Sequence, residues 1–219
     1  MPFTLHTTDL SPFGQRAKLA LHVKGLIKET ELEDTFGGTD ALGALAPMRQ
    51  IPILVHKGRA IPESQVIVEY LEDLYPNPSL LPELGKDRAI ARLLARIADL
   101  YIAPHLLTLI IAMRTPDEKS KILAGWEKLG RGLAYTEQYL MDDRPYAAGG
   151  FISIADIALA PFLFYVPRMR EFHHLPLLAS EPVKCKAYLK AIAPDPHIVK
   201  AFSEMECAFD KRVKLLKGI

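Results

Sequence analysis

Residues 11–16 read Ser-Pro-Phe-Gly-Gln-Arg, and two further short motifs follow them, Gln50-Ile51-Pro52 and Pro62-Glu63-Ser64. Serine followed by proline is an ordinary helix start, because serine caps free backbone N–H groups and proline fits the first helical position. Together the three motifs offer a hydroxyl group, an exposed backbone edge and a helix start that attracts anions. Their order along the chain predicts a site for a peptide-like ligand that carries a thiol.

The chain around these motifs alternates between strand-like and helical patterns. Lys57-Gly58 is typical of a two-residue hairpin turn, since glycine tolerates the positive φ that such a turn needs. The expected order is β-α-β-α-β-β-α. Strands are predicted over residues 3–7, 27–33, 53–56 and 59–61, and helices over 13–24, 39–45 and 63–74.

A proline-rich stretch separates this region from a helical remainder. Residues 75–82 contain three prolines and predict a linker, because proline cannot continue a helix. Beyond it, helices are expected over 87–113 and 117–140 and after Pro182 and Pro196. Another helix is expected to begin with a capping box made by Ser153 and Asp156, flanked by the apolar pair Ile152 and Ile157. This pattern gives Asp156 a role in folding rather than in catalysis.

Composition excludes several classes of function. The 27 basic and 26 acidic residues leave a net charge of +1, so no overall field attracts nucleic acid. The longest apolar run, Leu100 to Met113, is interrupted by Pro104 and His105 and indicates a buried helix rather than a membrane span. The first residues lack the pattern of a secretion signal, so we expect a cytoplasmic protein.

The two cysteines, Cys185 and Cys207, form neither a Cys-x-x-Cys pair nor a metal-ligand spacing. We therefore expect no metal site, and any thiol chemistry has to come from the ligand.

Four features of the chain carry a resemblance to a known family: Ser-Pro-Phe leading into Gln15-Arg16, Lys24-Gly25-Leu26, the later Gln-Ile-Pro, and Glu-Ser-x-x-Ile at Glu63 to Ile67. In them the chain resembles the cytosolic glutathione transferases, especially the bacterial, plant tau and omega-like branches. The resemblance spans essentially the whole length. It implies an α+β protein with a thioredoxin-like domain at residues 1–76, a linker at 77–86 and an all-helical domain at 87–219.

The resemblance also implies the reaction. Glutathione would be the co-substrate, a small hydrophobic electrophile the second substrate, detoxification the role and a homodimer the assembly. Ser11 would be the catalytic residue, since a hydroxyl hydrogen bond at a helix start favours a thiolate. Omega-class relatives carry cysteine at this position, which favours disulfide exchange. Serine predicts addition or substitution by glutathione instead.

Six further residues are assigned to glutathione binding by the same resemblance. Pro52 would be cis, so that the backbone of Ile51 pairs with the cysteinyl part of glutathione. Ser64 would bind the γ-glutamyl carboxylate and Glu63 would join the polar network around it. Phe13 is placed in the site as well, and Arg49 is expected to reach the glycine carboxylate.

Several alternatives stay open at this stage. Ser11 alone could be a plain helix cap. The protein could keep the fold as a non-catalytic binding or regulatory protein, or it could be a glutathione-dependent lyase that cleaves ethers, a dehalogenase or an isomerase. Candidate walls of the electrophile pocket, equally compatible with core packing, are Phe13, Tyr101, His105, Met113 and Tyr165.

Overall fold

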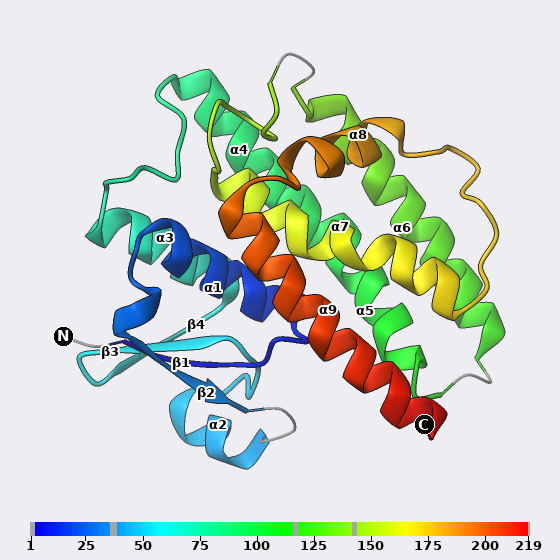
Figure 1. Ribbon diagram of the computed structural model, residues 1–219, viewed down its shortest axis with the longest axis horizontal. Helices are drawn as coiled ribbons and strands as arrows, with labels where there is room; N and C mark the ends of the chain where they lie inside the picture. The colour runs from blue at the N-terminus through cyan, green and yellow to red at the C-terminus, as the bar shows by residue number, and fades with distance from the viewer. Residues whose placement is uncertain (1–2, 36–38, 116–117, 142–143, 219) are drawn as a thin grey trace. The chain divides into compact units, whose positions relative to one another are not determined.

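The computed structural model describes residues 3–35, 39–115, 118–141 and 144–218 (Figure 1). The chain divides into two compact units. The first contains Met1–Leu80 together with Pro196–Lys211, and the second contains Leu81–Asp195 together with Arg212–Ile219. The last helix thus groups largely with the first unit. The domain boundaries expected from the sequence remain a prediction.

The first unit is built on a four-stranded sheet in the order β2-β1-β3-β4. Strand β1 runs parallel to β2 and antiparallel to β3, and β3 and β4 form a hairpin. Lys57 and Gly58 make the hairpin turn with φ values of 52° and 75°, which confirms the turn predicted from these two residues. The strands are β1 (Phe3–Thr7), β2 (Thr30–Asp34), β3 (Ile53–His56) and β4 (Arg59–Pro62).

Helices accompany this sheet in the predicted order β-α-β-α-β-β-α. Helices α1 and α3 pack together in the core of the unit, where Leu19, Ile67 and Leu71 are fully buried. The thioredoxin-like α+β fold is confirmed. The helices of the unit are α1 (Pro12–Val23), α2 (Thr39–Leu45), α3 (Ser64–Leu74) and most of α9 (Pro196–Lys217).

One predicted element is wrong at its beginning. Residues Ile27–Glu29 form a short 3-10 helix, η1, rather than the start of a strand. Gly25, with a φ of 72°, ends α1, and Thr30 donates its hydroxyl to the carbonyl of Leu26. Strand β2 can therefore begin only at Thr30, where the pairing with β1 also begins.

A buried lysine attaches the proline-rich segment to the first unit. The Lys24 Nζ atom donates to Glu72 at 2.5 Å and to the carbonyls of Tyr75 and Pro78 at 2.6 Å each. Glu72 also accepts the backbone N–H of Leu80 at 2.8 Å. An ammonium group has three donors, and all three are used, so this buried charge is fully hydrogen-bonded.

The second unit is helical. Helix α7 is its central element and is buried along most of its length. The sequence predicted one helix over 87–113, whereas the structure inserts a π-helical turn, η2, between α4 and α5. The predicted start at Asp117 lies outside the described residues. The elements are α4 (Gly85–Ile97), η2 (Ala98–Ile102), α5 (Ala103–Ala112), α6 (Lys119–Tyr139), α7 (Ile154–Phe172) and α8 (Val183–Ile192).

Asp156 forms the predicted capping box at the start of α7. Its carboxylate accepts the N–H of Ser153 at 2.9 Å, the hydroxyl of Ser153 at 2.8 Å, the N–H of Ala147 at 2.8 Å and the hydroxyl of Tyr188 at 3.0 Å. Burial raises the pKa of Asp156, and these hydrogen bonds oppose that shift. The predicted capping box of Ser153 and Asp156 is confirmed.

Gly85–Ala112 is long and apolar enough to cross a membrane by length and composition. A core helix of a soluble protein has the same properties. Leu106 and Leu109 of this stretch are fully buried in the structure, as expected for a buried helix. Packing into the second unit accounts for part of the apolar character of this stretch, whereas Leu100 and Ile111 are 50% and 64% exposed.

Candidate active site

Ser11 caps helix α1 just beyond the end of β1. Its backbone N–H donates to the carbonyl of Thr8 at 3.0 Å, and its Oγ accepts the N–H of Gly14 at 3.1 Å. A Cβ atom at Gly14 would lie 2.1 Å from Oγ1 of Thr7. Glycine is thus required here, because it lets the first turn of α1 approach the end of the strand.

The cap leaves the Ser11 hydroxyl suited to an anion. A serine hydroxyl has one donor and two acceptor positions, and the bond from Gly14 uses one acceptor position. The O–H donor remains available at a half-exposed position. The first turn of α1 adds the positive end of the helix dipole. Both effects favour a negatively charged ligand atom beside Ser11.

Lys18 holds the loop that precedes Ser11. Its buried Nζ atom lies 2.5 Å from Asp9 Oδ1 in this loop and 2.5 Å from Glu204 Oε2 in α9. Burial raises the pKa of Glu204, but Lys18 and Lys200 outweigh burial, so the pKa is lowered overall. The loop is thus connected to both α1 and the last helix.

Arg16 brings two of the sequence motifs together. The side chain is fully buried in α1, and its Nη1 donates to Ser64 Oγ at 3.4 Å. Its guanidinium carbon lies 5.4 Å from the centre of the Phe13 ring. Ser64 is itself buried, at the first position of α3. The structure therefore places a permanent positive charge next to this helix start.

Sequence reasoning missed this role for Arg16, although it quoted the residue within its motif. The available signal was the helical spacing, because Arg16 lies between Phe13 and Ala20 on the apolar face of α1. An arginine on such a face needs a buried polar partner.

The start of α3 is open to an anion. The side chain of Glu63 makes no capping hydrogen bond to the first N–H groups of this helix. Glu63 precedes it with a φ of 71°, a conformation that residues other than glycine rarely adopt and that is concentrated at ligand sites. The Glu63 side chain is exposed. Free N–H groups and the helix dipole together attract a carboxylate here.

The Ile51–Pro52 bond is cis, as the resemblance implies. Strand β3 begins only at Ile53, so Ile51 lies outside the paired part of the strand. Its side chain packs against the buried cluster formed by Leu42, Ala46 and Ile53. The backbone of Ile51 is thus held next to an ordered sheet.

Arg49 lies in the segment between helix α2, which ends at Leu45, and strand β3. Its Nη1 is 3.6 Å from Asp40 Oδ1, and a Cβ atom at Gly43 would lie 3.1 Å from its Nε. The side chain is 60% exposed, so this ion pair is weak. Arg49 would have to leave Asp40 in order to bind a ligand.

The candidate electrophile residues occupy different environments. Tyr165 and Met113 are buried, with 1% and 8% of their surface exposed. Tyr101 is exposed and packs edge-on against Tyr135 at 5.2 Å. The pKa of His105 is lowered by burial and by nearby positive charge. Tyr165 and Met113 thus belong to core packing in this structure.

Known proteins share this fold. The family description "Glutathione S-transferase, N-terminal domain" matches residues 5–79, and "Glutathione S-transferase, C-terminal domain" matches residues 89–191. A probable glutathione S-transferase from Nicotiana tabacum is 32% identical over 172 residues, which cover 78% of this chain and 74% of that protein.

Solved structures of glutathione S-transferases share the fold of this chain. The structure of rice GST1 (OsGSTU1) in complex with glutathione has a TM-score of 0.79 at 28% identity and covers 99% of this chain and 97% of that chain. The tau-class glutathione S-transferase from Mangifera indica has a TM-score of 0.76 at 29% identity and covers 97% of this chain and 98% of that chain.

Fold and site thus define a thioredoxin-like protein with an attached helical region and an anion-attracting site at two helix starts. The chain belongs to the cytosolic glutathione S-transferase family, whose enzymes use glutathione as their co-substrate.

Proposed function

We propose that this enzyme transfers glutathione to a small hydrophobic electrophile, with Ser11 stabilising the glutathione thiolate. The observation that carries the proposal is the Ser11 hydroxyl, which accepts from Gly14 at the start of α1 and keeps its own proton for donation. A free thiol has a pKa of about 8.5 and is mostly protonated at neutral pH. Donation to the sulfur and the positive helix end both stabilise the thiolate and lower this pKa.

The reaction then follows from the thiolate. Its sulfur forms a bond to an electrophilic carbon, and either a leaving group departs with its electron pair or an addition product takes up a proton. Ser11 gains and loses no covalent bond in this sequence. A cysteine at the same position would instead attack a disulfide or form one with glutathione.

The remaining site residues hold glutathione in this proposal. Ser64 and the open start of α3 receive the γ-glutamyl carboxylate, supported by the charge of Arg16. Glu63 joins the polar network at that end, and Phe13 packs beside Arg16. The backbone of Ile51, before Pro52, pairs with the cysteinyl residue as an added strand. Arg49 reaches the glycine carboxylate after leaving Asp40.

The experiment that tests the role of Ser11 is a pH titration of thiolate absorbance with saturating glutathione. In Ser11→Ala the pKa of the bound thiol should rise and turnover should fall, while affinity for glutathione stays close to that of the wild type. Ser64→Ala is the matched control, because it should weaken binding without changing the thiol pKa at saturation. Identical titration curves for wild type and Ser11→Ala would reduce Ser11 to a helix cap.

A panel of electrophiles separates the possible reactions. Conjugation is expected to exceed ether cleavage, dehalogenation and isomerisation. Glutathione binding without any turnover would instead identify a non-catalytic binding or regulatory protein.

We further propose that the protein is a cytoplasmic homodimer, as is typical of the family. Sedimentation should give a species twice the 24.4 kDa of the chain. A species of one chain at all concentrations would contradict the dimer.

A further inference from the structure

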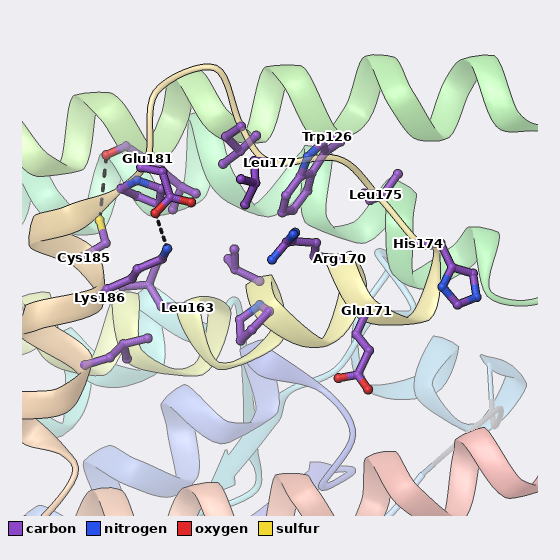
Figure 2. Close-up of a pocket in the computed structure, with 16 residues that line it drawn as sticks. Trp126, Leu163, Arg170, Glu171, His174, Leu175, Leu177, Glu181, Cys185 and Lys186 are labelled. Atoms are coloured by element: carbon purple, nitrogen blue, oxygen red, sulfur yellow. Dashed lines mark hydrogen bonds and ion pairs between the residues drawn. The ribbon is translucent and has the colours of Figure 1, made fainter.

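The second unit contains a cavity of about 640 Å³ lined by α6, α7, α8 and the segment 173–182 (Figure 2). Small-molecule sites in proteins have volumes of roughly 300 to 1,000 Å³ and mainly apolar walls. This cavity matches both properties. Its apolar walls include Trp126, Leu133, Leu163, Val166, Leu175 and Leu189.

The walls are held in place by specific contacts. The Trp126 Nε1 donates to the carbonyl of Pro176 at 3.0 Å, which attaches the segment 173–182 to α6. A Cβ atom at Gly130 would lie 2.8 Å from Cδ2 of Leu178, so glycine lets this segment approach the helix closely. On the α8 side, the N–H of Cys185 donates to Glu137 at 3.1 Å. The cavity is therefore a built feature rather than a gap under a loose loop.

One positive side chain at the cavity is available to a ligand, that of Arg170, a solvent-exposed residue. Figure 2 shows Arg170 between Trp126 and α7, with its guanidinium turned toward the centre of the lining side chains, whereas the carboxylate of Glu171 points away from them. Lys186 is already neutralised by Glu181 at 2.5 Å. Among the residues that the structure describes, the Arg170 side chain has no hydrogen-bond or ion-pair partner.

We propose that this cavity binds a small amphipathic carboxylate, with its apolar body against Trp126 and Leu163 and its carboxylate on Arg170. A guanidinium matches a carboxylate well, because its planar fork donates two parallel hydrogen bonds. Among the charged lining residues, Lys186 and Glu181 pair with each other and Glu171 points away, so Arg170 is the charge that can fix the orientation of such a ligand beside the apolar walls. The cavity shares no residue with the site around Ser11 and Ser64, so this binding does not depend on the proposed reaction.

Trp126 is the only tryptophan of the chain, so its fluorescence reports on this cavity directly. Octanoate and its neutral counterpart octanamide are the probes. In the wild type, octanoate should change the emission in a saturable manner, and octanamide should bind at least tenfold more weakly. Arg170→Met should weaken octanoate at least tenfold and leave octanamide unchanged, whereas Arg170→Lys should retain part of the preference. Val166→Phe should weaken both probes by filling the cavity.

Two controls separate this cavity from other sites. Arg131→Met changes an exposed arginine of α6 that does not line the cavity, and it should bind octanoate like the wild type. Ser64→Ala should also keep the octanoate affinity. The proposal is overturned by the absence of a saturable change, by equal affinities for octanoate and octanamide, or by unchanged octanoate binding in Arg170→Met. Loss of octanoate binding in Ser64→Ala would assign the signal to the glutathione site.

Discussion

Replacing Arg16 with methionine should weaken glutathione binding about a hundredfold without changing the pKa of the bound thiol. In the structure, Arg16 Nη1 lies 3.4 Å from Ser64 Oγ. A carboxylate that accepts from Ser64 over one further hydrogen bond would lie no more than about 6 Å from this nitrogen. At an effective dielectric constant of about 20, two unit charges at that separation attract by about 2.8 kcal/mol, which corresponds to about two factors of ten in affinity.

Calorimetry with glutathione and with an analogue that lacks the γ-glutamyl α-carboxylate forms a double-mutant cycle. Removing this carboxylate should cost the wild type about a hundredfold more in affinity than it costs Arg16→Met, because both proteins keep Ser64 and the start of α3. Circular dichroism at the working temperature checks that the variant is folded, because Arg16 is fully buried. If Arg16→Met weakens both ligands by the same factor, the guanidinium acts on the fold and not on the carboxylate. Wild-type affinity in the variant would also refute the argument.

Three other changes test separate parts of the structure. Ser11→Cys should shift activity from conjugation toward disulfide exchange, which is measured with a mixed-disulfide substrate. Unchanged conjugation activity in this variant would show that the side chain at position 11 does not act on the reacting thiol. Gly14→Ala should lower the free energy of unfolding by about 1 to 3 kcal/mol in a urea titration, because its Cβ would overlap Thr7. Gly85→Ala is the control and should change the free energy of unfolding little, because no atom lies within 4 Å of its Cβ. Burial lowers the pKa of His56 below 6.5, so the unfolded chain binds more protons, and the free energy of unfolding should fall as the pH drops below about 6.5. His56→Gln should flatten that dependence, and an unchanged slope would contradict it.

The fold was predictable from local signals where those signals are strong. Lys57-Gly58 determines the hairpin, and the capping box of Ser153 and Asp156 determines the start of α7, since each depends on neighbours within three residues. The π-helical turn at Ala98–Ile102 was not predictable in this way. It accompanies a close approach of α6, where a Cβ at Gly132 would lie 2.2 Å from the carbonyl oxygen of Tyr101. Such a contact depends on tertiary packing and leaves no mark on the apolar periodicity.

The candidate site shows the same division. The two helix starts of the site could be located from Ser11 and Ser64, but the positive charge of Arg16 beside Ser64 could not. Arg16 and Ser64 are 48 positions apart, and only the packing of α1 against α3 brings them together. Arg49 is a second such case, because its ion pair with Asp40 depends on how the chain turns after α2 and was not visible in its motif.

The ion pair between Lys18 and Glu204 has a consequence for how the protein is made. A ribosome releases the N-terminal end first, so the sheet and α1 emerge long before α9 is synthesised. During that interval Lys18 has Asp9 but lacks Glu204, and its ammonium group has only part of its native environment. The first unit can therefore reach its final state only after α9 has left the ribosome. Nascent chains stalled before Pro196 should be cut by protease within the first 80 residues at positions that the finished protein protects.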